Sequence, residues 1–272
     1  MGTAASTRSR RQWPLTALVV LVYIFLVAPS LIVIIISFGD TDEYMFPPRR
    51  LSFYIYQLYF NDVQWLNATR QSFIVAGLTM VLSMAVALPA AYATARFTFF
   101  MRAGLNYLLI LPAVVPNVVI AVGLYFYLGQ LGLNGTTTGL VLGHTLIAAP
   151  FSFIMILAGL RQVDPNLEAA ARIMGASELR VLTRVTIPLL LPSIVGGALI
   201  AFLMSFDEFI IAFFISSSAT ETLRVRMFAA IRWEISPIIA AVSSLLTLVS
   251  LVAVMLVTLG ASRKRAAPSS EG

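Results

Sequence analysis

Two adjacent carboxylates, Asp207 and Glu208, stand inside an otherwise apolar stretch of the chain. The residues before them, 185–206, carry no charge, and the residues directly after them are apolar again. A carboxylate at membrane depth is costly, so it normally faces a protein interior or a water-filled cavity and has a partner. That partner is either an arginine of the segment 224–232 or a cationic solute, and the sequence leaves both interpretations open.

Aromatic side chains could hold such a cation against their ring faces. We therefore take Asp207 and Glu208, together with Phe206, Tyr125 and Trp233, as candidates for a substrate pathway. In a different class of protein, a proton-coupled carrier that needs no ATPase, the two carboxylates would act as a proton relay.

The sequence offers little else for catalysis. It has no cysteine and a single histidine, His144, so we expect no metal site, and no Ser/His/Asp arrangement supports a membrane enzyme. It also lacks the Gly-x4-Gly-Lys-Ser/Thr loop that binds ATP. We predict a non-catalytic chain without a cofactor of its own, in which any ATP and Mg²⁺ belong to a partner. The basic residues do not cluster with aromatics, so nucleic acid is not an expected partner.

A polar segment, residues 161–186, separates two apolar runs and carries helix signals. Asp164 is a good N-cap, Pro165 suits the first helical position, and Glu168 lies in the first turn, where the helix dipole favours negative charge. The three alanines 169–171 give this helix a flat face of small side chains. We therefore predict a short helix that begins at Pro165.

A second short helix should follow. Gly175 can adopt positive φ and end the first helix, and Ser177 can cap the next one. Pro188 would then stop or kink that second helix. The segment is thus predicted to be two short helices joined at a glycine.

The composition places the chain in a membrane. Of its 272 residues, 59% are hydrophobic and 11% are charged, which is too apolar for a soluble domain. Spanning the hydrocarbon takes roughly 20 apolar residues as a helix. The longest charge-free run is long enough for two spans and is broken at 129–135, so six spans are expected. The charge-free runs are 13–38, 71–95, 103–160, 185–206 and 235–262.

Six spans put both termini on one side of the membrane. Most of the 18 basic residues fall on that side, which the positive-inside rule makes cytoplasmic. We expect a cytoplasmic segment 1–12, a transmembrane domain 13–262 and a cytoplasmic tail 263–272. Pro112 and Pro116, four residues apart, must distort the third span, and a bent packing helix and a binding site remain equal alternatives there.

The loop resembles the "EAA" loop of permease subunits of bacterial ABC importers, in which Glu-Ala-Ala, three residues, Gly, nine residues and Ile-x-Leu-Pro follow one another. Counting from Gly175, the triplet falls on Ala169, Ala170 and Ala171, so the glutamate stands one residue early, at Glu168. Counting forward gives Val-Thr-Ile-Pro at 185–188. The resemblance implies that the loop docks on a cytoplasmic ATPase through Glu168, Ala169, Ala170, Ala171, Gly175 and Ser177.

From Trp13 to Gly260 the chain looks most like the second permease of spermidine/putrescine importers, notably in Ser-Phe-Asp-acidic at 205–208 and in residues 223–237. The resemblance implies an all-α, six-helix type I ABC importer permease in the cell (inner) membrane. Its partners would be a second permease forming a heterodimer, an ATPase dimer, a periplasmic or extracellular substrate-binding protein and membrane lipid. Polyamines are the expected solutes; the same architecture also serves amino-acid derivatives, thiamine, phosphonates and metal ions.

Overall fold

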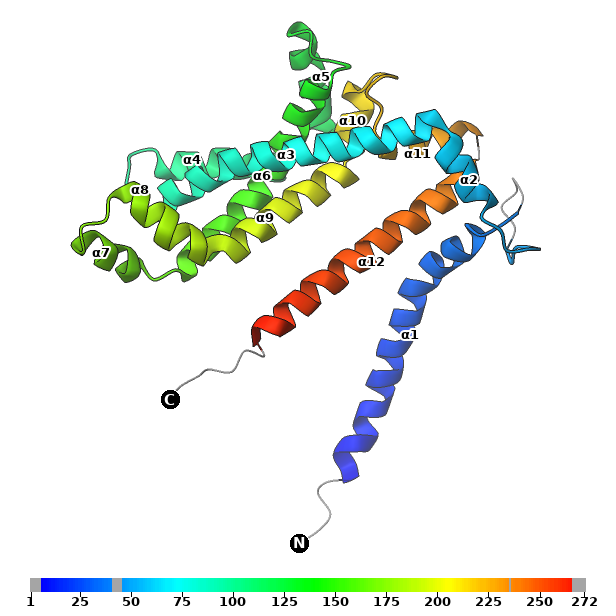
Figure 1. Ribbon diagram of the computed structural model, residues 1–272, viewed down its shortest axis with the longest axis horizontal. Coiled ribbons are helices and arrows are strands. Elements are labelled where there is room, and N and C mark those ends of the chain that lie inside the picture. The colour runs from blue at the N-terminus through cyan, green and yellow to red at the C-terminus, as the bar shows by residue number, and fades with distance from the viewer. Residues whose placement is uncertain (1–5, 41–45, 235, 266–272) are drawn as a thin grey trace. The chain divides into compact units, whose positions relative to one another are not determined.

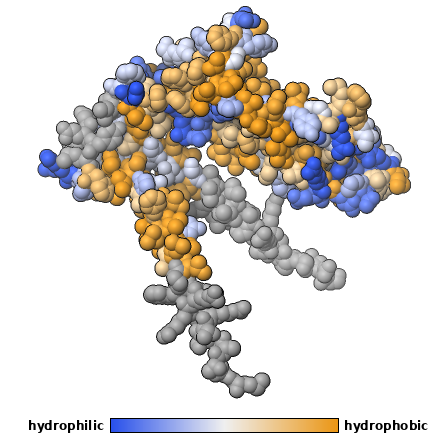
Figure 2. All heavy atoms as spheres, turned by 180° about the vertical axis from the view of Figure 1, so that it is seen from behind, coloured by the Kyte–Doolittle hydropathy of each residue, from blue (hydrophilic) through white to orange (hydrophobic). Residues whose placement is uncertain are grey.

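The computed structural model describes residues 6–40, 46–234 and 236–265, and every regular element in these ranges is a helix. The all-α prediction is therefore confirmed. The first five residues of the predicted segment 1–12 and most of the predicted tail 263–272 lie outside the described residues. Figure 1 shows long helices joined by short ones, and Figure 2 shows apolar side chains over much of the described surface.

The chain divides into two compact units. The first unit comprises Met1–Val63 and Ala229–Gly272, and the second comprises Gln64–Phe228. The helices of the first unit are α1 (Ser6–Ile36), α2 (Tyr54–Asn61), the π-helix η3 (Ala230–Glu234) and α12 (Ile238–Arg265).

In the first unit α12 packs against both α1 and α2. The Tyr56 hydroxyl lies 2.8 Å from the Ser37 hydroxyl and donates to the Ser244 hydroxyl at 3.1 Å. These three hydroxyls link α2, the end of α1 and α12. A side chain on the short α2 thus links the ends of two long helices.

The second unit contains the remaining helices. In chain order they are α3 (Val63–Arg96), α4 (Arg102–Ile110), η1 (Leu111–Ala113), α5 (Asn117–Gln130), α6 (Thr137–Gln162), α7 (Pro165–Ile173), α8 (Glu178–Val181), the π-helix η2 (Leu182–Thr186), α9 (Ile187–Asp207), α10 (Ile210–Ile215) and α11 (Leu223–Ala229).

The centre of this unit is the packing of α6 against α9, and α3 shares a buried cluster with both. Phe153 and Ile156 of α6 are fully buried, with Ala87 and Ala91 of α3 and Leu190 of α9 in the same cluster. A second buried cluster joins α5, α6 and α10. Small residues on α3 therefore let the larger side chains of α6 fill the space between three helices.

Two buried polar contacts join α6 and α9, and one of them is the Ser152 hydroxyl, which donates to the Gly197 carbonyl at 2.9 Å. His144 of α6 is buried, and its Nδ1 lies 2.8 Å from the Ser205 hydroxyl of α9. In the parts of the chain that the structure describes, no group of His, Cys, Asp and Glu could hold a metal. His144 is therefore a contact between helices.

The third predicted span is broken, as its prolines indicated. α4 with η1 and then α5 meet at an angle of 101°. Pro112 lies in η1, and Pro116 directly precedes α5 with an extended ψ of 131°. Because neither proline has an N–H to donate, the helix cannot continue through them without losing backbone hydrogen bonds. The predicted distortion is confirmed.

Among the residues that the structure describes, four helices are long and apolar enough to cross a membrane, and the bent pair of α4–η1 and α5 would make five. They are Leu15–Ile36, Val63–Arg96, Thr137–Gln162 and Glu178–Asp207. The described apolar part of α12, Ile238–Leu251, is shorter. The chain is thus a multi-pass membrane protein, and the count of six spans stays a prediction.

The contact between α6 and α9 generates a test. A Cβ added at Gly159 of α6 would collide with the side chain of Ser193, whereas a Cβ at Gly77 of α3 would meet nothing within 4 Å. We expect Gly159→Ala to cost about 1–3 kcal/mol of stability, the usual penalty for overpacking. Gly77→Ala is the matched control and should be neutral or stabilising, because alanine has the better helix propensity. Thermal unfolding in detergent measures both, and equal midpoints for the two variants would contradict the packing.

Candidate functional site

The first half of the loop 161–186 folds as its sequence predicts. The Asp164 side chain accepts a hydrogen bond from the Asn166 N–H at 2.9 Å, and α7 begins at Pro165. Gly175 has a φ of +86°, so it takes the left-handed conformation that ends α7. The predicted first helix and its glycine terminator are confirmed.

The second helix of the loop is longer than predicted. Pro188 does not stop it, because α8, η2 and α9 continue as one helical stretch, Glu178–Asp207. The turn directly before the proline, Leu182–Thr186, is π-helical. A wider π turn relieves the contact between a proline ring and the preceding carbonyls, so the helix passes through.

The structure separates the predicted docking residues into two groups. Glu168 is 1% exposed and Ala171 is 7% exposed, while Ala169, Ala170 and Ser177 are exposed. The three alanines therefore do not share one flat face, because successive residues of a helix turn by about 100°. Glu168 and Ala171, three residues apart, point into the chain together.

The exposed side of the loop carries an apolar surface. Large side chains on α7 and just after it are well exposed, including Ile173 at 87% and Met174 at 81%. We call the following set the loop surface: Leu167, Ala169, Ala170, Ile173, Met174 and Leu179. Hydrophilic residues also gather at this end of the unit, on the right in Figure 2. Exposed apolar groups rimmed by polar ones typically mark a protein contact.

The two carboxylates that the sequence singled out have different environments. Asp207 ends α9, its side chain is 69% exposed, and it forms an ion pair with Arg224 at the beginning of α11. Glu208 is 7% exposed and accepts a hydrogen bond from the Ile211 N–H at 2.8 Å. The arginine partner expected for the acidic pair is therefore present for Asp207.

Glu208 also connects two helix beginnings. Its second carboxylate oxygen accepts from the Asn117 side-chain amide at 3.4 Å, and Asn117 is the first residue of α5. The carboxylate thus serves the start of α10 and the start of α5, both of which follow breaks in apolar helices. Such breaks are tolerated where side chains satisfy the freed backbone groups.

The aromatic candidates lie in separate contacts. The ring centroid of Phe206 lies 5.1 Å from that of Phe73. The Phe206 ring also stacks on the ring of Phe202, with 5.9 Å between the two centroids. Tyr125 of α5 is 45% exposed and its ring contacts that of Phe126. Trp233 belongs to the first unit, where it is 79% exposed and lies 6.0 Å from the Arg232 guanidinium. Their role in a substrate pathway stays a prediction.

A family profile matches more than half of the chain. Residues 83–265 match the family described as "Binding-protein-dependent transport system inner membrane component". The chain belongs to this family. It is a permease subunit of a type I ABC importer, a class that works with a substrate-binding protein.

Individual relatives cover nearly the whole permease. The spermidine/putrescine transport system permease protein PotC of Haemophilus influenzae is 28% identical over 88% of this chain and 93% of its own length. The putrescine transport system permease protein PotI of Escherichia coli K12 is 28% identical over 87% of this chain and 86% of its own length.

A solved structure agrees with the fold. A chain of a bacterial ABC transporter involved in the import of the acidic polysaccharide alginate superposes with a TM-score of 0.76 at 16% identity. The match covers 97% of this chain and 99% of that chain.

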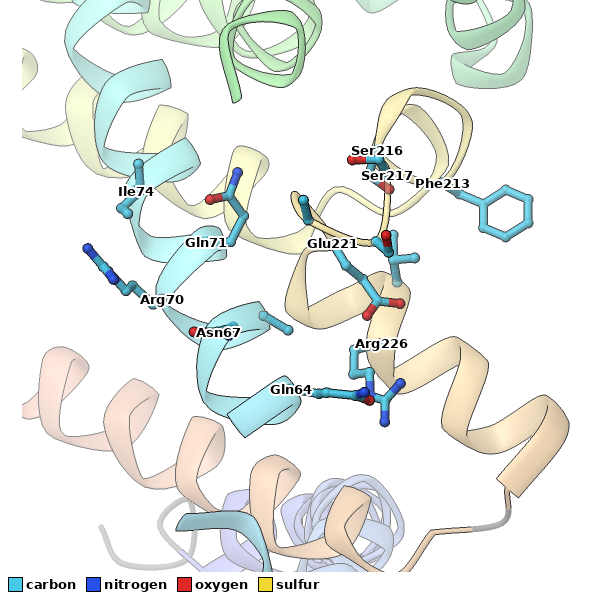
Figure 3. Close-up of a pocket in the computed structure, with 14 residues that line it drawn as sticks. Gln64, Asn67, Arg70, Gln71, Ile74, Phe213, Ser216, Ser217, Glu221 and Arg226 are labelled. Atoms are coloured by element: carbon cyan, nitrogen blue, oxygen red, sulfur yellow. The ribbon is translucent and has the colours of Figure 1, made fainter. Parts of the chain in front are cut away.

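The permease also has a polar cavity that the sequence reasoning missed. It has a volume of about 830 Å³ and lies in the second unit, between the start of α3 and the segment 216–226. In Figure 3 Gln64, Asn67 and Gln71 line it from α3, with Ser216 and Glu221 on the other side. The spacing of three and four residues between polar side chains at the start of an apolar helix was the available signal.

Glu208 generates the test of this site. Glu208→Ala removes the acceptor for the Ile211 N–H and the Asn117 amide, and we expect it to cost about 1–3 kcal/mol because buried donors lose their partner. Asp207→Asn disrupts a largely exposed pair and should stay within about 1 kcal/mol. Thermal stability of the assembled complex in detergent measures both. A larger loss for Asp207→Asn than for Glu208→Ala would contradict these assignments.

Proposed function

We propose that this permease forms half of the translocation pathway of an ATP-driven importer for polyamines such as spermidine and putrescine. The observation that carries the proposal is the similarity to permeases named for these solutes, which extends over 86–93% of their length. The chain makes and breaks no bond. ATP and Mg²⁺ are bound by a separate ATPase subunit.

The loop surface supports the coupling part of the proposal. An apolar surface on a polar segment suits a groove on a cytoplasmic ATPase, with Ala169 and Ala170 allowing close approach. Gly175 turns the chain beside it, and Ser177 occupies the N-cap position of α8 without the predicted side-chain hydrogen bond. When the ATPase dimer closes on ATP, the docked loops approach each other, and the pathway opens to the outside.

The importer contains a second, different permease, an ATPase dimer and an external substrate-binding protein that delivers the solute. The permease lies in the inner membrane with both termini and the loop 161–186 in the cytoplasm. The excess of basic residues on that side supports this orientation.

Another small polar solute is the second candidate. Asp207 pairs with Arg224 and Glu208 caps a helix, so in this chain the two carboxylates are already engaged without a cation. The same contacts weigh against a proton-coupled carrier, in which a relay needs carboxylates that exchange protons. The cavity beside α3 is lined by side-chain amides and by Arg70, Arg226 and Glu221, so it suits hydrogen-bonding solutes.

Uptake decides between the two solute classes. Proteoliposomes that hold the whole importer, with its binding protein and internal ATP, should accumulate radiolabelled spermidine. Unlabelled putrescine should compete for uptake, and histidine should not. Vesicles without ATP are the control. Accumulation that persists without ATP would favour a carrier, and ATP-driven uptake of histidine but not spermidine would replace the proposed solute.

The docking surface has its own test. Met174→Glu places a charge in the middle of the loop surface and should greatly reduce both co-purification of the ATPase and ATP hydrolysis stimulated by the binding protein. A charge desolvated without a partner costs several kcal/mol, enough to lose binding by about 100-fold or more. Asn166→Glu is the matched control, because it adds the same charge to an exposed position of α7 outside the loop surface. Equal ATPase binding by both variants would contradict docking through this surface.

A further inference from the structure

One carboxylate of the loop is turned away from the loop surface. The Glu168 side chain is 2% exposed, and its Oε1 accepts from the Arg96 Nε at 3.0 Å and from the Thr186 hydroxyl at 3.0 Å. Arg96 is the last residue of α3, and Thr186 directly precedes α9. A single oxygen atom of α7 therefore joins the ends of two long helices.

The partners of this carboxylate are themselves held in place. Arg96 also donates through Nη2 to the Val163 carbonyl at 3.1 Å, just after the end of α6, and its side chain is 11% exposed. Thr186 is 1% exposed. Charge-assisted hydrogen bonds to a desolvated carboxylate are stronger and more directional than those between exposed groups. The contact therefore resists sliding of α7 against the helix ends.

The other two ion pairs of the loop involve Arg172. Its Nη2 lies 3.8 Å from the Glu168 Oε2. It also donates to Glu178 at 2.6 Å, and in this pair the two side chains are 37% and 65% exposed. This pair joins α7 to α8 on the outside of the loop. It offers a comparison in which the same kind of contact is solvated.

We propose that Glu168 is a positioning residue that locks α7 to the ends of α3 and α9, so that a displacement of the docked loop is passed to both helices. The inference rests on the proposed docking of this loop on an ATPase. Glu168 acts through Arg96 and Thr186 and does not touch the ATPase, because its carboxylate is buried inside the chain.

The two locked helices lead away from the loop. α3 has 34 residues, so it is about 50 Å long at 1.5 Å per residue. Its other end, with Gln64, Asn67 and Gln71, lines the polar cavity, and Ser218 lies on the opposite wall. The end of α9 pairs with Arg224 through Asp207. Motion of α7 would thus be delivered to the cavity end of this unit.

A cysteine at the cavity can report that motion. The sequence has no cysteine, so Ser218→Cys, at an exposed position, is the only thiol of this chain. In the assembled importer, ATP with vanadate should change its labelling rate by a membrane-impermeant maleimide, read from this chain after the subunits are separated. This readout needs no transported solute.

Three substitutions in that background test the lock. Glu168→Gln keeps the shape of the side chain and should leave the ATPase bound, but it should shrink the ATP-dependent change in labelling about fivefold or more, the lower range of ordinary coupling between sites. Thr186→Val removes only the hydroxyl donor. It should also shrink the ATP-dependent change in labelling, but by less than Glu168→Gln does. Glu178→Gln weakens the exposed pair, leaves the contacts of Glu168 with Arg96 and Thr186 in place, and should change nothing.

The outcomes separate the alternatives. A full labelling response in both Glu168→Gln and Thr186→Val overturns the proposal. Loss of ATPase binding by Glu168→Gln with a full response in Thr186→Val also overturns it, and makes Glu168 a docking contact. If Glu168→Gln does not assemble, a reduced response in Thr186→Val supports the lock and a full response refutes it.

The proposed function has its own outcomes in the same experiment. An unmodified importer that shows the labelling change but takes up no spermidine refutes the polyamine proposal alone. An unmodified permease that binds no ATPase refutes docking itself.

Discussion

The need to satisfy every backbone N–H and C=O away from water shapes this permease. Inside hydrocarbon a chain can meet that need only as a helix, so each interruption requires a local remedy. At Pro112 and Pro116 the helix turns by 101°, and before Pro188 it widens into a π turn. After α9 the remedy is a side chain, because the Glu208 carboxylate accepts the N–H of Ile211. The irregular places in the fold are thus also the places where polar groups enter it.

The same constraint gives neighbouring acidic residues different tasks. Glu208 is buried and makes its hydrogen bonds to the beginnings of α10 and α5. Asp207, one residue earlier, is largely exposed and pairs with Arg224. A carboxylate pair that looks like a single charged site in the sequence is therefore two contacts, one that supports a break between helices and one on the surface of the unit.

In the docking loop the usual distribution of polar and apolar side chains is reversed. Its large apolar side chains, Ile173 and Met174 among them, face outward, while Glu168 faces inward to Arg96 and Thr186. An amphipathic helix normally buries its apolar side. The reversed arrangement of α7 is stable because Arg96 and Arg172 form ion pairs with the buried carboxylate, and it leaves the apolar side available for a partner.

The sequence by itself determined the membrane class, the helical fold, the start of α7 at Pro165, its termination by the following Gly175 and the distortion at Pro112 and Pro116. These follow from local rules, since hydrophobic length, capping and missing N–H groups act over a few residues. Only the tertiary structure decided that Ala171 points inward with Glu168, that Arg224 is the arginine that pairs with Asp207, and that Pro188 is passed by a π turn. Arg96 and Glu168 are 72 residues apart, and no local pattern relates them. Their contact exists because α3, α6 and α9 pack together and bring their ends to one place.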